Sequence, residues 1–189
     1  MLKSYLKKNK KINFLDCTLR DGGYYNNWDF KLNTIQKYLN SMKDINIYFV
    51  ELGFRFNDKK KIKGLTAYTS DKTIQKLNIP KNINIGIMIN ASDLLENNHL
   101  DLSVLKRLIN INSSKKIKFV RIACHFHEIF KIDECIKYLK KLNLEIFINL
   151  MQISEIKKSQ IKLVINHLKK NSIKKFYIAD SLGSLTPKE

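Results

Sequence analysis

Six short apolar runs recur along the chain, and an amphipathic pattern separates most of them from the next. The runs are rich in β-branched and aromatic residues and are apolar almost throughout, as is typical of parallel strands covered on both faces. Their starts lie roughly 30 residues apart, the size of one strand–helix unit. The predicted strands are INFLDCT (12–18), IYFVELG (47–53), INIGIMI (83–89), IKFVRIA (117–123), LEIFINL (144–150) and KKFYIAD (174–180).

The intervening segments place apolar residues three and four positions apart, with lysines opposite them, which predicts helices. These segments are 32–45, 101–111, 132–143 and 154–170. Repeated strand–helix units leave two architectures, an open doubly wound sheet or a (β/α)₈ TIM barrel. A barrel takes about 250 residues, whereas this chain has 189 and reaches Thr186 and Pro187, which are typical of the first turn of another helix. We therefore expect an α/β fold, a TIM barrel truncated to about six βα units over residues 12–189, after a basic extension at 1–11.

The formal charge of +18 raises the question of nucleic-acid binding. Only four of the 35 basic residues are arginine, whereas specific nucleic-acid sites tend to use arginine forks. We therefore expect no nucleic-acid partner, and attraction of anionic substrates instead. No run approaches the roughly 18 apolar residues that span a bilayer, and no secretory signal is evident. We therefore expect no membrane partner. The three cysteines lack paired spacing, which fits a protein of the reducing cytoplasm.

Polar residues gather where the predicted strands end, which is where parallel α/β folds place their sites. The candidates are Arg20, Asp21, Glu51, His125, His127, Asp180 and Ser181. Gly22 and Gly23 follow the first pair directly. Because glycine lacks a side chain, these two residues predict a sharp turn that brings the carboxylate beside the guanidinium.

The first three candidates suggest a chemistry. The Asp21 carboxylate suits a hard divalent ion such as Mg²⁺ or Mn²⁺. Arg20 stays cationic and can donate to an oxygen that gains negative charge. Glu51 could hold Arg20 in place, because a buried guanidinium needs a partner. The alternative is an Arg20–Glu51 ion pair that only closes the barrel. Cys17 is expected to pack within the first strand rather than act as a nucleophile.

Four segments together resemble the metal-dependent aldolase and lyase superfamily, whose members are TIM barrels. They are LDCTLRDGGY (15–24), FVELGF (49–54), FVRIACHFHE (119–128) and YIADSLGSLTP (177–187). The superfamily includes 4-hydroxy-2-oxovalerate aldolase, to which the likeness is greatest, hydroxymethylglutaryl-CoA lyase and isopropylmalate synthase. The resemblance implies a lyase that cleaves or forms a carbon–carbon bond of a 2-oxo acid through a pyruvate-type enolate, using Mn²⁺ or Mg²⁺. It implies that Asp21 is a metal ligand, that Arg20 stabilises the enolate and that Glu51 orients Arg20.

Two features depart from that family. Its members carry a His-x-His pair of metal ligands on the seventh strand, and none follows within these 189 residues. His125 and His127 have the same spacing and should share one face of the fourth strand. We expect them to line the substrate pocket rather than bind the metal, with Asp180 and Ser181 as further substrate contacts. The aldolases carry a histidine that serves as general base soon after the RDG segment, whereas this chain has Tyr24 and Tyr25 there. Tyrosine is a poor base at neutral pH, so the base is left unassigned.

Three alternatives remain open. The chain could be a synthase of the same superfamily that condenses an acyl-CoA with a 2-oxo acid. It could also be a non-catalytic barrel fragment that needs a partner chain, since exposed strand edges seek pairing. A basic nucleic-acid-binding domain is the third. The expected partner is a small 2-oxo acid, and a homo-oligomer or a dehydrogenase partner, the latter known for the aldolases, is left open.

Overall fold

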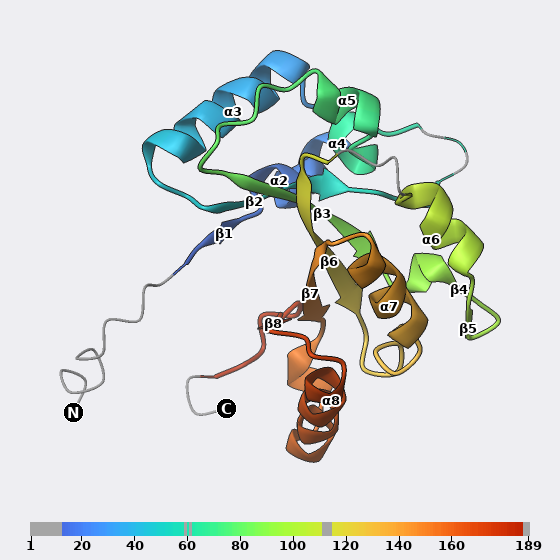
Figure 1. Ribbon diagram of the computed structural model, residues 1–189. Helices are drawn as coiled ribbons and strands as arrows, with labels where there is room; N and C mark the ends of the chain where they lie inside the picture. Colours follow the sequence, from blue (N-terminus) through green and yellow to red (C-terminus); the bar gives the residue numbers. More distant parts are fainter. Residues whose placement is uncertain (1–12, 59, 61, 111–114, 187–189) are drawn as a thin grey trace.

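The structure, a computed structural model, describes residues 13–58, 60, 62–110 and 115–186. The expected basic extension at 1–11 lies outside the described residues. Six parallel strands form one sheet in the order β1-β2-β3-β6-β7-β8 and curl into a half-barrel (Figure 1). This is the α/β arrangement of part of a TIM barrel, as the sequence predicted.

The six strands of the sheet match the six predicted runs. Their bounds are β1 Leu15–Asp16, β2 Phe49–Phe54, β3 Asn84–Asn90, β6 Ile117–Cys124, β7 Glu145–Leu150 and β8 Lys175–Ile178. The first strand is much shorter than predicted because the chain enters a helix at Thr18. A separate antiparallel hairpin joins β4 Leu95–Glu96 to β5 His99–Leu100.

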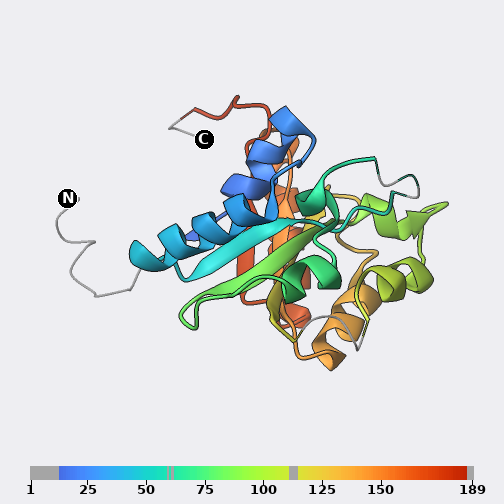
Figure 2. The ribbon, with the colours of Figure 1, turned by 90° about the horizontal axis from the view of Figure 1, so that it is seen from above.

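The helices lie mainly along the outer side of the sheet (Figure 2). Their bounds are α2 Thr18–Asn26, α3 Leu32–Asp44, α4 Leu65–Tyr68, α5 Asp71–Gln75, α6 Leu102–Leu108, α7 Asp133–Lys141 and α8 Lys158–Lys170, with 3₁₀ turns η1 Ser92–Leu94 and η2 Ile153–Glu155. The last helix begins at Lys158 rather than near Ser154, and the Gln160 side chain accepts a hydrogen bond from the Lys157 backbone N–H at 2.9 Å. Within the described residues, no helix combines the length and apolarity needed to cross a bilayer.

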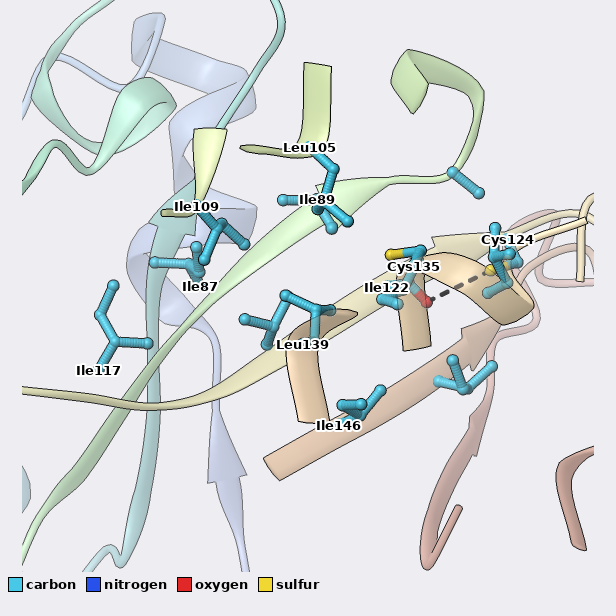
Figure 3. Close-up of a cluster of buried hydrophobic side chains, with 14 of the residues drawn as sticks. Ile87, Ile89, Leu105, Ile109, Ile117, Ile122, Cys124, Cys135, Leu139 and Ile146 are labelled. Atoms are coloured by element: carbon cyan, nitrogen blue, oxygen red, sulfur yellow. Dashed lines mark hydrogen bonds between the residues drawn. The ribbon is translucent and has the colours of Figure 1, made fainter. Parts of the chain in front are cut away.

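Isoleucines dominate the core between the sheet and its outer helices (Figure 3). Ile87 and Ile89 of β3 are completely buried, as is Leu139 of α7. Cys124 and Cys135 are buried in this same core. This packing explains why the strands read as continuous apolar runs, since the residues that alternate with the outward isoleucines face the barrel interior.

An aromatic layer fills the barrel interior at the amino-terminal end of the strands. The rings of Phe119 and Phe147 stack with centroids 4.4 Å apart, and Phe49 packs edge-on against both. The ammonium of Lys175 lies 4.1 Å from the Phe49 ring centroid and 4.5 Å from that of Phe147, at cation–π range. Gly86 makes room for this layer, because a Cβ atom there would lie 2.2 Å from the Phe119 ring. The interior is therefore solid at this end.

Candidate active site

Arg20 projects from α2 over the carboxyl end of the half-barrel. Its Nε donates to Glu51 Oε1 at 2.8 Å, and its Nη1 forms an ion pair with Asp21. Its backbone carbonyl accepts a hydrogen bond from Trp28 Nε1 at 2.9 Å, and its guanidinium lies 5.7 Å from the Phe54 ring centroid. The predicted contact between Arg20 and Glu51 is therefore present, and Asp21 lies beside them as expected.

The two glycines do not form the turn that the sequence suggested. Gly22 and Gly23 both lie inside helix α2. A Cβ atom on Gly23 would lie 1.9 Å from the Trp28 indole, whereas one on Gly22 would meet nothing nearer than Phe30, at 3.7 Å. Gly23 therefore serves close packing of the indole against the helix, and the prediction of a glycine turn was wrong.

The chain changes direction on either side of α2 instead. At its start, the Thr18 backbone N–H donates to Asp16 Oδ1 at 2.9 Å, which satisfies one of the free N–H groups of the first turn. At its end, Asn27 and Trp28 both adopt left-handed conformations, with φ of 55° and 57°. A bulky residue such as tryptophan is rarely left-handed, so packing and the indole hydrogen bond must stabilise this geometry.

Arg121 is a second arginine at the site and was not among the residues predicted from the sequence. It lies in the middle of β6, and its Nη1 donates to Glu51 Oε1 at 3.3 Å. Its Nη2 donates to Asn149 Oδ1 at 2.5 Å, and its guanidinium lies 4.6 Å from the Tyr177 ring centroid. The clue was its position in the predicted strand 117–123: Arg121 lies between Val120 and Ile122, which pack in the outer core, whereas the other charge of that run, Lys118, is exposed.

Burial and the two arginines act in opposite directions on Glu51. Complete burial raises the pKa of Glu51 above its ordinary value, and the charges of Arg121 and Arg20 partly oppose that rise. Burial by itself would lower the pKa of Arg20, but Glu51 and Asp21 together oppose it, so the pKa of Arg20 is raised and the guanidinium stays charged. The site thus contains a buried carboxylate between two permanent cations.

A cavity of about 560 Å³ opens above these groups. This volume is suited to a small molecule. Charged and polar groups line it together with a set of apolar side chains. The lining residues are Cys17, Arg20, Asp21, Tyr24, Phe54, Met88, Asn90, Arg121, Ala123, Asn149, Met151, Ala179 and Ser181. Cys17 thus faces the cavity just beyond β1 instead of packing within that strand.

His125 and His127 lie outside the set of residues that line this cavity. Strand β6 ends at Cys124, and the chain turns immediately, so the two-residue alternation of a strand no longer applies. The two rings are parallel with centroids 5.9 Å apart, and the His125 backbone N–H donates to Glu128 Oε2 at 2.7 Å. The expectation that both histidines line the pocket assumed a longer strand.

The two candidates after β8 have different positions. The Ser181 side chain lines the cavity, as predicted, and its Oγ accepts a hydrogen bond from the Gln152 backbone N–H at 3.3 Å. Asp180 Oδ2 accepts from the Leu185 backbone N–H at 2.9 Å. This and neighbouring backbone hydrogen bonds lower the pKa of Asp180, so its carboxylate stabilises the turn that follows the strand.

The fit of a divalent metal rests on Asp21. Its carboxylate is the only one among the described residues that line the cavity, and 61% of the side chain is exposed. The described part of the chain contains no group of three histidine, cysteine, aspartate or glutamate residues that could hold a metal ion. A hard cation such as Mg²⁺ keeps several waters and often uses one or two carboxylates plus substrate oxygens. The described residues therefore fit a loosely held hard cation and do not form a closed metal site.

Comparisons with known structures point to one fold. The N-terminal domain of a candidate aldolase from Bacteroides vulgatus is 31% identical over 94% of this chain and 57% of its own, with a TM-score of 0.72. The hydroxymethylglutaryl-CoA lyase of Pseudomonas aeruginosa is 9% identical over 94% of this chain and 60% of its own, with a TM-score of 0.69. The HMG-CoA lyase of Bacillus subtilis is 12% identical over 95% of this chain and 61% of its own, with a TM-score of 0.71.

The chain therefore spans about three fifths of the length of these structures. No curated protein sequence matches it. The family model described as HMGL-like matches residues 11–189, which is nearly all of the chain. The curled parallel sheet and the likeness to lyase and aldolase structures agree with that match. The chain belongs to the HMGL-like family.

Proposed function

We propose that this protein is a carbon–carbon lyase of the aldolase type, which acts on a 2-oxo acid through a pyruvate-type enolate. The observation that carries the proposal is the Arg20 guanidinium, held on buried Glu51 at the edge of a cavity sized for a small molecule. Membership of a family whose structural relatives include lyases and a candidate aldolase supports the same reaction class. The 4-hydroxy-2-oxovalerate type of substrate is our specific suggestion.

In the cleavage direction, the bond between C3 and C4 of a 4-hydroxy-2-oxo acid breaks. Its electron pair moves into the 2-oxo fragment to form an enolate, while the 4-hydroxyl loses its proton and becomes an aldehyde. Arg20 would donate a hydrogen bond to the enolate oxygen. Its Nη2 makes no hydrogen bond to any residue within 13–58, 60, 62–110 or 115–186, so that nitrogen can donate to a ligand. Preorganised donors of this kind stabilise charge that develops in the transition state.

The cavity walls suit a molecule with one polar and one apolar part. Asn90, Asn149 and Ser181 provide uncharged hydrogen-bonding groups around the two arginines. Phe54, Met88, Ala123 and Met151 pack together as an apolar cluster on another part of the wall. We propose that the acid end of the substrate contacts the polar side chains and that the aldehyde fragment contacts the apolar cluster.

A divalent ion, Mn²⁺ or Mg²⁺, belongs to the proposal because members of this family generally use such metals. When bound, it would act as a Lewis acid that polarises the 2-oxo group. Asp21 is the residue of this chain that would hold it, through hard carboxylate oxygens at the cavity mouth.

Proton exchange at the methyl group of pyruvate tests the proposal directly. The protein is incubated with pyruvate in D₂O, with and without Mn²⁺ or Mg²⁺, and loss of the methyl signal is followed by ¹H NMR. We expect metal-dependent exchange, which Arg20→Ala should slow by about 10²–10³. Absence of exchange in the metal-supplied native protein would contradict the enolate mechanism and favour a non-catalytic barrel fragment.

A further inference from the structure

Two arginines share one oxygen atom of Glu51. Arg20 Nε lies 2.8 Å from Glu51 Oε1, and Arg121 Nη1 lies 3.3 Å from the same atom. Glu51 Oε2 is buried and has no hydrogen-bond partner among the residues that the structure describes. The arginines are therefore the hydrogen-bond donors that this carboxylate uses within the described chain.

Arg121 is the more firmly held of the two guanidiniums. Its Nη2 donates to Asn149 of β7, Tyr177 of β8 lies against its plane, and its Nη1 also approaches Cys17 Sγ at 3.8 Å. Arg20, by contrast, comes from a helix at the cavity mouth and divides its donors between Glu51 and the exposed Asp21. Arg121 is thus fixed by the sheet, whereas Arg20 depends on Glu51.

Glu51 holds Arg20 firmly only when the Glu51 side chain is negatively charged. Moving a carboxylate out of water disfavours its ionised form, and an adjacent permanent cation restores it. A protonated Glu51 would have a weaker hold on Arg20, because hydrogen bonds between ionised partners are roughly twice as strong as neutral ones. Arginine cannot deprotonate in a protein, so Arg121 supplies its positive charge at every accessible pH.

We propose that Arg121 is a positioning residue: by holding Glu51 as a carboxylate from the floor of the barrel, it fixes the guanidinium of Arg20 at the cavity. Its catalytic consequence rests on the proposed function, whereas its effect on Glu51 does not. The charge of Arg121 is the largest single influence that opposes the effect of burial on the pKa of Glu51, and the charge and hydrogen bond of Arg20 act in the same direction.

Several titratable or charged groups interact electrostatically with Glu51. They are Cys17 after β1, Arg20 and Asp21 of α2, Tyr38 of α3, Arg121 of β6 and Tyr177 of β8. Burial raises the pKa of Cys17, Tyr38 and Tyr177, so these three stay neutral at neutral pH. The two arginines are therefore the groups whose charges favour the ionised form of Glu51.

The direct test is a ¹³C NMR titration of glutamate side-chain carboxyls, in which Glu51→Gln identifies the Glu51 signal. We expect the pKa of Glu51 to rise in Arg121→Met and to stay near the native value in Arg121→Lys, which keeps the charge. Arg107→Met removes an exposed arginine outside the cavity and should leave the pKa of Glu51 unchanged. A native titration curve for Glu51 in folded Arg121→Met overturns the inference.

A second, less disruptive variant tests the same proposal if Arg121→Met does not fold. Asn149→Ala removes the acceptor of Arg121 Nη2 and leaves the charge in place. If Arg121→Met does not fold, Asn149→Ala carries the test. It should raise the pKa of Glu51 by less than the full loss of Arg121 would, and an unchanged titration in Asn149→Ala counts against the proposal.

The catalytic consequence is measured by the pyruvate exchange rate as a function of pH. Arg121→Met should lower the rate about 10- to 100-fold, as is typical when a supporting residue is lost, and the acid limb of the profile should move to higher pH. Arg121→Lys should restore the native limb. If the native protein shows no exchange, the proposed function fails while the Glu51 titration still decides the role of Arg121. If exchange occurs but Arg121→Met leaves its rate and profile native, Arg121 is not a positioning residue.

Discussion

The guanidinium of Arg20 remains partly accessible, with 12% of its side chain exposed, although it is paired with a glutamate that is completely buried. This combination separates two tasks between neighbouring residues. Glu51 fixes the orientation from inside the barrel, and Arg20 presents its remaining donors to the cavity. An arginine that only closed the barrel would not need to line a cavity of this size.

Loss of the Arg20 side chain should therefore affect chemistry far more than folding. We expect Arg20→Ala to lower the rate of pyruvate proton exchange by about 10²–10³, because removal of one preorganised donor commonly costs that much. The rate is measured by ¹H NMR at saturating pyruvate. Arg107→Ala, which removes an exposed arginine elsewhere, is the control, and near-native exchange in Arg20→Ala would exclude the assigned role.

Cys17 offers a pH-dependent measurement at the same cavity. Burial is the main cause that raises the pKa of its thiol. Since the thiolate is the reactive form, alkylation by iodoacetamide should be slow at neutral pH and should accelerate as the pH rises beyond the ordinary range of a cysteine.

Intact-protein mass spectrometry follows the alkylation. One adduct is expected in the native state, because Cys124 and Cys135 are buried. Cys17→Ser should remove that adduct. Rapid labelling of Cys17 at neutral pH would mean that its thiol is not raised in pKa as described.

Helix α2 is an element that the sequence did not predict. Its segment combines an apolar start with two adjacent glycines, which together indicate the end of a strand and a turn. The contacts that support the helix come from the residues that flank it, since the Asp16 side chain satisfies its first turn and Trp28 packs against Gly23. Long amphipathic helices such as α3 and α8 were predictable because their own periodicity is sufficient.

The two glycines of α2 provide a matched pair of substitutions. Gly23→Ala should destabilise the protein by about 1–3 kcal/mol, because the added methyl group overlaps the buried Trp28 indole and overpacked sites cost about this much. Gly22→Ala has room for its methyl group and should stabilise the helix by about 0.5–1 kcal/mol.

Urea denaturation of both glycine variants measures the difference. The free energy of unfolding should decrease in Gly23→Ala and increase or stay level in Gly22→Ala. Equal effects of the two substitutions would argue against the packing of the indole on α2.

The residues at the ends of the strands were only partly predictable from the sequence. The partner of Arg20 was predictable because a buried guanidinium needs a carboxylate, and Glu51 was the acidic residue in the neighbouring strand. The placement of His125 and His127 was not, since it depended on where β6 stops. Arg121 was not selected because its strand also carries Lys118, and the sequence does not show which of the two charges faces the barrel interior. Its partners Glu51 of β2 and Asn149 of β7 become apparent only when the sheet curls.

For the whole molecule, the half-barrel and its charge act together. The order of the sheet follows the order of the chain, which is why six recurrent units were enough to predict the architecture. The chain has a formal charge of +18, and the cavity walls carry two arginines and one exposed aspartate. Such a field raises the local concentration of anions.

The affinity for an anionic substrate should therefore depend on ionic strength. We expect the KM for pyruvate in the exchange assay to increase as NaCl is added from low to physiological concentration, because salt screens charges beyond about 10 Å. The kcat should change much less, since the pair formed by Arg20 and Glu51 is buried. A KM that is independent of salt would mean that the overall charge does not assist binding.

The packing of Trp28 on α2 also supplies a built-in optical reporter. The chain has one tryptophan, and its indole N–H is bonded to the backbone carbonyl of Arg20 itself. Tryptophan emission, excited at wavelengths that the eight tyrosines do not absorb, therefore arises from a single indole next to the residue that would meet the ligand. Changes in its emission on addition of a 2-oxo acid would report occupancy of the cavity without any engineered label, and a red shift in denaturant would report release of the helix.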